Sequence, residues 1–268
     1  MAQALPTVFL SHGSPMHAIA PGAVREAWQS LAAALPRPKA LLMVSAHWET
    51  HLPMLTGNAK PETIHDFYGF PRPLYQVQYP APGAPEVAEH ALALLKAAGF
   101  TAAIDGCRGL DHGAWSPLLH MYPDADIPTL QVSVQTELGP RHHLQLGAAL
   151  APLADEGVLV FGSGHMTHNL REAFGAMRRG DEHPAPLPYI AEFTQWVNER
   201  IAGRDLAALA DYRRQAPHAA RAHPTEEHFL PLFVALGAAA GAGGDYKTEK
   251  VYQDTELQSL AMDAWALH

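Results

Sequence analysis

The sequence has very little cysteine, because Cys107 is the one cysteine in 268 residues. A single thiol can form neither a disulfide within the chain nor a thiolate cage for a metal ion, and a reducing cytoplasm is the simplest setting for it. Long apolar runs are also lacking, and none approaches the roughly 18 residues that a membrane span needs. The first ten residues carry neither a basic start nor an extended apolar segment, so no signal peptide is predicted.

Basic charge is the next scarcity, with 18 lysines and arginines against 27 acidic residues and a formal net charge of -9. An acidic chain without a basic run is not expected to bind nucleic acid or an anionic membrane. The motifs H-E-x-x-H and G-x-S-x-G are absent, which argues against zincin proteases and serine hydrolases. Hydrophobic residues make up 48%, enough for a sizeable core, so the chain is predicted to be globular.

Short apolar runs alternate with segments of helical periodicity. Strands are predicted at Thr7–Leu10, Ala40–Ser45, Pro128–Val134 and Gly157–Gly162. Helices are predicted at Gly22–Leu35, Pro85–Ala98, His142–Leu153, Tyr189–Ile201 and Phe229–Ala240, the last one broken by Gly241–Gly244, and Arg204–Ala222 is predicted to be a surface loop or helix. This alternation predicts an α/β fold with one domain over residues 1–268 and a largely parallel or mixed central sheet flanked by helices.

Histidine is abundant, with 17 residues, and several histidines follow the predicted strands. His12 follows the first strand, His47 follows the second, and His165 and His168 follow Gly157–Gly162. A single histidine in such a place is more often structural than functional. Ligands of open α/β sheets bind at the carboxyl ends of the strands, however, and three strands bring histidines to that edge. We therefore predict a histidine site at the C-terminal ends of the strands.

Three further histidines are candidates for the same site. His112 and His65 are expected on loops, and His228 stands at the start of the last apolar helix, where Thr225 is a predicted N-cap. Imidazole groups suit zinc, iron, copper or nickel. His65 has an equally simple explanation as an aromatic loop residue. The acids just before His228, Glu226 and Glu227, are expected to be a solvated helix start.

Six segments resemble, in order, those of the class III extradiol dioxygenases. They are Ser11-His12-Gly13-Ser14-Pro15, Ser45-Ala46-His47-Trp48, Thr63-Ile64-His65-Asp66-Phe67, Asp111-His112-Gly113, His168-Asn169-Leu170 and Thr225-Glu226-Glu227-His228-Phe229-Leu230-Pro231. The chain is most similar to the DOPA 4,5-dioxygenase-like branch, related to the catalytic subunit of protocatechuate 4,5-dioxygenase. Each segment is unspecific alone, and the ordered set is specific.

The resemblance implies a non-haem Fe(II) enzyme that opens a catecholic ring beside its hydroxyls with O2, so a small catecholic substrate and O2 are the expected partners. By position, His12, His47 and His228 match metal ligands. His168 matches the general acid/base, although some relatives are described with it among the ligands, and His112 matches a histidine that contacts substrate or oxygen. His65, Phe67 and Tyr68 are the expected substrate-binding residues, with core packing as the alternative for the aromatic rings.

One departure leaves the metal open. Better-known relatives hold iron with two histidines and a glutamate, whereas the third position here is His228, directly after Glu226 and Glu227. A three-histidine site also suits Zn(II), so a zinc-dependent hydrolase is the first alternative, and a non-enzymatic metal or small-molecule binding protein is the second. The identity of the catechol, a contribution from either glutamate and a homodimer are also left open.

Overall fold

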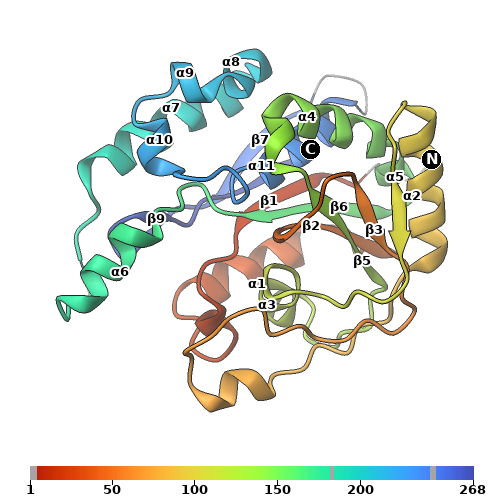
Figure 1. Cartoon of the computed structure of the whole chain (residues 1–268), viewed down its shortest axis with the longest axis horizontal. Helices are drawn as coiled ribbons and strands as arrows, with labels where there is room; N and C mark the ends of the chain where they lie inside the picture. Colours follow the sequence, from red (N-terminus) through yellow and green to blue (C-terminus); the bar gives the residue numbers. More distant parts are fainter. Residues whose placement is uncertain (1–4, 182–183, 242–245) are drawn as a thin grey trace.

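Eight strands form one sheet at the centre of the computed structural model, which describes residues 5–181, 184–241 and 246–268 (Figure 1). The strand order is β4-β3-β5-β2-β6-β1-β10-β7. Four neighbouring strands in the middle run parallel: β5 (Thr129–Val134), β2 (Ala40–Glu49), β6 (Val158–Gly164) and β1 (Thr7–Ser11). Their carboxyl ends therefore meet at one edge of the sheet.

Strands at both sides make the sheet mixed. On one side lie β3 (Met54–Thr56), antiparallel to β5, and β4 (Ala103–Asp105). On the other lie β10 (Ala264–Leu267), antiparallel to β1, and β7 (Thr248–Tyr252). A separate ribbon consists of β8 (Thr255–Glu256) and β9 (Leu260–Ala261). The predicted single-domain α/β fold with a largely parallel or mixed sheet is confirmed.

Helices cover both faces of the sheet. Successive side chains of a buried strand point to opposite faces, so each face is apolar and packs against helices. Leu42 and Val44 pack in one apolar cluster, and Leu41 and Met43 pack in the other. The first cluster includes α2 (Pro85–Ala97), α4 (Gly139–Leu150), α7 (Pro188–Ala202) and α11 (Leu230–Gly241), and the second includes α1 (Val24–Ala34) and α3 (His112–Met121). The result is a layered α/β/α arrangement around the sheet.

Shorter elements connect these layers: η1 (Pro15–Ala18), η2 (Arg72–Gln76), η3 (Thr136–Leu138), α5 (Pro152–Asp155), α6 (Leu170–Arg178), α8 (Leu206–Ala210), α9 (Tyr212–Gln215) and α10 (Ala219–Ala222). The segment Arg204–Ala222 is thus largely short helices. The predicted helix His142–Leu153 is wrong in its bounds, since a proline at position 152 begins a second helix. Helix α11 ends at Gly241, and the rest of the predicted glycine break, residues 242–244, lies outside the described residues.

Two elements around the predicted site differ from expectation. His112 is the first residue of α3 and not part of a loop. Thr225 does not cap the last helix, because its hydroxyl donates to Glu227 at 3.1 Å and α11 begins five residues later, at Leu230. Strand β2 also continues past its predicted end, so that His47 lies within the strand.

Helices α4 and α11 approach closely through a pair of glycines. A Cβ on Gly147 of α4 would overlap the carbonyl oxygen of Val234, and one on Gly237 of α11 would overlap the carbonyl oxygen of Leu144. Such an overlap can be relieved only by moving backbone, because the opposing atoms are not flexible side chains. The close contact fixes α11 relative to α4, and α11 begins immediately after the turn that carries His228.

We expect Gly147→Ala to lower the free energy of unfolding by about 1–3 kcal/mol, the usual cost of forcing extra volume into a packed interior. Urea denaturation followed by circular dichroism would measure it. Gly175→Ala in α6 is the matched control, since the nearest atom to its new methyl group is the flexible tip of Arg179 at 3.5 Å. The control should be neutral or slightly stabilising. Equal stability of the two variants would contradict the packing argument.

Candidate metal centre

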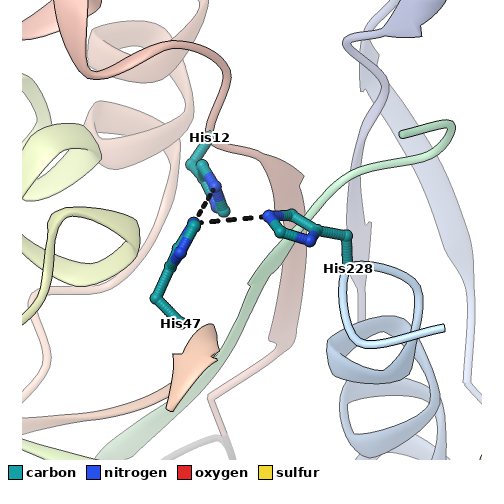
Figure 2. Close-up of side chains that lie close together, drawn as sticks. All are labelled: His12, His47 and His228. Carbon is teal, nitrogen blue, oxygen red and sulfur yellow. Dashed lines mark hydrogen bonds between the residues drawn. The ribbon is translucent and has the colours of Figure 1, made fainter. Parts of the chain in front are cut away.

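Three histidines from separate parts of the chain point toward one another at the carboxyl edge of the sheet (Figure 2). His12 directly follows β1, His47 lies near the end of β2, and His228 lies in the turn before α11. The Nε2 atom of His47 is 3.0 Å from Nε2 of His12 and 3.3 Å from Nε2 of His228. The strand register explains the meeting, because Ser11 lies beside Gly164 and Ser45 beside Ser163, so His12 and His47 come at the same level along the sheet.

Hydrogen bonding assigns the tautomer of His12. Its Nδ1 lies 3.0 Å from the hydroxyl oxygen of Ser163. That hydroxyl donates its own proton to the carbonyl of Gly113, so it accepts from His12. The Gly113 carbonyl is available because the residue four positions later in α3 is Pro117, which has no N–H to donate. The proton of His12 is therefore on Nδ1, and the lone pair of Nε2 faces the other histidines.

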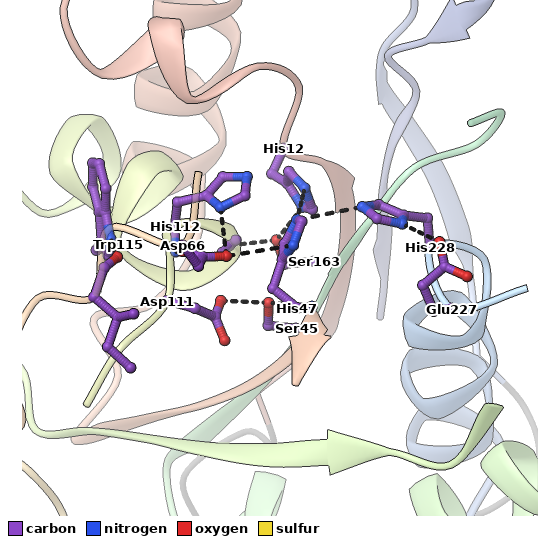
Figure 3. A network of polar contacts seen from close by, with 12 residues as sticks. His12, Ser45, His47, Asp66, Asp111, His112, Trp115, Ser163, Glu227 and His228 are labelled. Atoms are coloured by element: carbon purple, nitrogen blue, oxygen red, sulfur yellow. Dashed lines mark hydrogen bonds and ion pairs between the residues drawn. The ribbon is translucent and has the colours of Figure 1, made fainter. Parts of the chain in front are cut away.

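Carboxylates lie beside the outer nitrogens of the other two rings (Figure 3). Nδ1 of His47 is 3.4 Å from Asp66, and Nδ1 of His228 is 2.8 Å from Glu227. Burial alone would raise the pKa of Asp66, but its hydrogen bonds and charge interaction with His112 prevail and lower that pKa to about 2. Burial raises the pKa of Glu227. A carboxylate oxygen beside each Nδ1 favours a proton on that nitrogen, which leaves both Nε2 lone pairs pointing inward.

The resulting donor set fits a divalent transition metal ion. Burial, followed by the charges of neighbouring histidines, lowers the pKa of His47 to about 4 and places the pKa values of His12 and His228 well below the ordinary value. A ligand imidazole must be neutral, and its second nitrogen is usually fixed by a carboxylate or similar acceptor. Three lone pairs facing one another repel unless a cation lies between them. This triad could therefore hold a metal.

Among the residues that the structure describes, two other groups of side chains have similar spacing: His47 with Asp66 and His112, and His168 with Glu227 and His228. In both groups the carboxylate already accepts a hydrogen bond from the Nδ1 atom of a histidine. These carboxylates orient the rings. The three converging Nε2 atoms of His12, His47 and His228 remain the best candidate ligands.

The two histidines predicted to be catalytic lie on either side of the triad. The ring of His168 stacks on His228, with centroids 3.4 Å apart and planes 16° apart, and burial lowers its pKa to about 3. The ring of His112 lies 3.9 Å from that of His47, and its Nδ1 is bound to Asp66 at 2.8 Å. The structure therefore brings together all five histidines that the sequence selected for ligands and chemistry.

The predicted substrate-binding residues are less uniform. Phe67 packs edge-on against His112, with ring centroids 5.6 Å apart. His65 lies behind Phe67 and donates from Nε2 to the carbonyl of Val77 at 3.0 Å. Tyr68 is 92% exposed, so its side chain points away from the core. Of these three residues, Phe67 is the one whose ring contacts a histidine of the cluster.

Sequence reasoning missed the side chains that orient the ligands. Glu227 was expected to be solvated, but its side chain is 15% exposed and bound to His228, whereas Glu226 binds Tyr212 at 2.8 Å. The position of Asp66, within the segment that contains His65, was a usable signal. Nothing in the sequence marked Ser163 as the partner of His12. His165 is also buried beside His12, and its Nε2 accepts from the Gly13 N–H at 3.1 Å, which fixes the loop after β1.

Comparisons with known proteins agree with this geometry. Residues 6–262 match the family model described as the catalytic LigB subunit of aromatic ring-opening dioxygenase. The chain is 44% identical to a 4,5-DOPA dioxygenase extradiol of Beta vulgaris over 92% of this chain and 90% of that protein. It is 38% identical to a protein of the same name from Escherichia coli K12, over 88% of this chain and 86% of that protein.

A solved structure is also similar. It is the crystal structure of an uncharacterized protein of Escherichia coli K12, which superposes with a TM-score of 0.79 at 31% identity and covers 98% of this chain and 99% of that one. Among the described residues, no helix is both long and apolar enough to cross a membrane. The family match, the two relatives and the solved structure extend over nearly the whole chain, and they set aside the hydrolase and non-enzymatic alternatives. The chain belongs to the family of the catalytic LigB subunit of aromatic ring-opening dioxygenase, and it is an extradiol ring-cleaving dioxygenase.

Proposed function

We propose that this enzyme is a non-haem Fe(II) dioxygenase that cleaves a catecholic ring beside its two hydroxyls with O2. The supporting observation is the convergence of three neutral Nε2 lone pairs, with two further histidines next to them. When bound, Fe(II) supplies open coordination positions and the redox chemistry that O2 activation requires. Zn(II) suits the same nitrogens but is redox-inactive, so ring cleavage favours iron.

His12, His47 and His228 are the proposed ligands. Their outer nitrogens are already engaged by Ser163, Asp66 and Glu227, so the rings need no reorientation to present their inner nitrogens. Preorganisation of this kind raises affinity, because the cost of ordering the ligands falls on folding and not on metal binding.

His168 is the proposed general acid/base. Its ring is parallel to that of His228, so it lies beside the ligand set and is not one of the three converging nitrogens. Glu227 lies 3.9 Å from its Nδ1 and would stabilise the imidazolium that forms when His168 accepts a proton from a catechol hydroxyl. The same proton can then be returned to an oxygen of the opening ring.

His112 is proposed to contact substrate or oxygen through Nε2. Its Nδ1 is bound to Asp66, and its backbone N–H donates to the same carboxylate at 2.9 Å, so the ring cannot turn freely. Phe67, packed on His112, supplies apolar surface for an aromatic ring. The names of the Beta vulgaris and Escherichia coli relatives make DOPA the first catechol to test.

The overall proposal predicts metal-specific oxygen consumption. Metal-free protein loaded anaerobically with Fe(II) should consume O2 with at least one member of a panel of catechols and form a coloured ring-opened product. Protein loaded with Zn(II) should consume none, because zinc does not change oxidation state. An oxygen electrode and absorption spectra would follow both reactions. If the Fe(II) protein is inactive with every catechol, the proposal fails.

The ligand assignment predicts loss of metal on truncation. His12→Ala and His228→Ala should each bind Fe(II) far more weakly than the wild type, because each removes one of three nitrogens, and elemental analysis after gel filtration would report the retained iron. His90→Ala is the matched control, since that histidine is exposed and pairs with Glu156 at 2.8 Å on the surface. The ligand assignment would be wrong if His12→Ala kept a full equivalent of iron.

The acid/base assignment predicts a separation of metal binding from turnover. His168→Ala should retain iron and lose about 100-fold or more in kcat, the typical contribution of a positioned general base. Iron content and steady-state O2 uptake, measured on the same preparation, give the two readouts. Loss of iron together with activity would instead make His168 a ligand.

A further inference from the structure

A buried carboxylate lies beneath the histidine cluster and touches none of the converging nitrogens. Asp111 is fully buried and directly precedes His112 (Figure 3). Its carboxylate accepts hydrogen bonds from Ser45 at 2.6 Å, from the Gln131 amide at 2.8 Å and from Arg108 at 3.1 Å. So many donors on one buried acid mark a structured centre, because an unpaired buried charge is costly.

One part of this network fixes the backbone of His47. The Ser45 hydroxyl oxygen accepts from the His47 N–H at 3.2 Å, and Arg108 donates to the His47 carbonyl at 3.2 Å. The sheet does not do this by itself, since the pairing of β2 with β5 is interrupted between Val44 and Glu49. His47 therefore lies in an irregular stretch of strand whose conformation depends on side chains bound to Asp111.

The other part fixes the start of α3. Gln131 of β5 meets Asp111 twice, because its amide oxygen accepts from the Asp111 N–H at 3.0 Å while its amide nitrogen donates to the carboxylate. This paired contact ties the residue before His112 to the centre of the sheet. Gly113 then packs against β2, and a Cβ there would overlap the Ser45 hydroxyl and lie 3.1 Å from the His47 ring.

The third partner of the carboxylate, Arg108, balances its charge. Arg108 binds the buried carboxylate and also stacks over the Trp48 ring, with its guanidinium carbon 4.7 Å from the ring centroid. The positive charge is thus held in place by an aromatic ring from the end of β2. Removal of the negative charge would leave Arg108 without its counter-ion and leave the donors of Ser45 and Gln131 competing for fewer acceptors.

We propose that Asp111 is a positioning residue that holds His47 and His112 at a fixed separation, so that metal affinity and turnover both depend on a side chain that touches neither metal nor substrate. The inference rests on the proposed function, because the roles of His47 and His112 are the ones proposed above. It also explains the two residues on either side of His112: Asp111 holds the network, and Gly113 leaves room for Ser45 and His47.

Asp111→Asn tests the inference with little change in shape. The variant replaces one acceptor oxygen by an NH2 group among groups that are themselves donors. We expect Co(II) affinity, titrated by visible absorption, to fall about 10–100-fold, the usual effect of losing a partner that orients a metal ligand. The kcat for O2 uptake at saturating Fe(II) should also fall, because His112 loses its anchor. Asp126→Asn, the same change in an exposed ion pair with Arg37, should alter neither quantity.

Ser45→Ala separates the contacts that hold His47 from those that hold the start of α3, and it tests the inference if Asp111→Asn does not fold. It removes the hydroxyl that links Asp111 to the His47 backbone and leaves the Gln131 and Arg108 contacts of Asp111 in place, so Co(II) affinity should fall by a larger factor than kcat at saturating Fe(II). If folded Asp111→Asn has a lower Tm but unchanged Co(II) affinity and kcat, Asp111 is merely structural and the inference is overturned. Unchanged Co(II) affinity in Ser45→Ala overturns it equally. A wild type that neither binds Co(II) nor consumes O2 overturns the proposed function together with the inference.

Discussion

Three neutral imidazole rings must present their lone pairs to one point, with Nε2 atoms as close as 3.0 and 3.3 Å, and the rest of the site follows from that constraint. Without a cation the arrangement is unfavourable, because lone pairs repel and the rings would gain by rotating. Each ring is prevented from rotating by an acceptor on its outer nitrogen. The stability of the fold is thus used to keep a cation-binding geometry that the histidines would not adopt alone.

The fold meets this constraint through local departures from regular structure. The register of the parallel strands brings His12 and His47 to one level at the carboxyl edge, but neither ladder hydrogen bonds nor helix geometry orient their rings. A proline inside α3 frees the Gly113 carbonyl, which engages Ser163 and so decides the tautomer of His12. A break in the β2 pairing lets His47 be held by side chains instead. Irregularities of this kind are expected where geometry serves a site and not the core.

The strands and the proximity of the five histidines were predictable because both depend on local pattern. An apolar run such as Ala40–Ser45 indicates a buried strand. A histidine that follows such a strand is expected at the carboxyl edge of the sheet. The partners were not predictable, since Ser163 and Asp66 act through contacts with residues 151 and 46 positions away in the chain. The start of α3 at His112 was hidden by Pro117, which breaks helical periodicity. The exposure of Tyr68 was not predictable either, because sequence does not reveal which way a loop side chain points.

The identity of the third ligand changes the electrostatics of the proposed centre. Two histidines and a glutamate bring one negative charge to the metal, whereas three neutral histidines bring none. In this chain the carboxylates lie behind the ligand rings, Asp66 3.4 Å from Nδ1 of His47 and Glu227 hydrogen-bonded to Nδ1 of His228. A carboxylate that accepts from Nδ1–H makes the opposite nitrogen a stronger electron donor. Glu227 therefore increases the electron donation of His228 to the metal and supplies part of the negative charge that a directly bound glutamate would provide. The same carboxylate lies 3.9 Å from Nδ1 of His168, where a proton must be held during turnover.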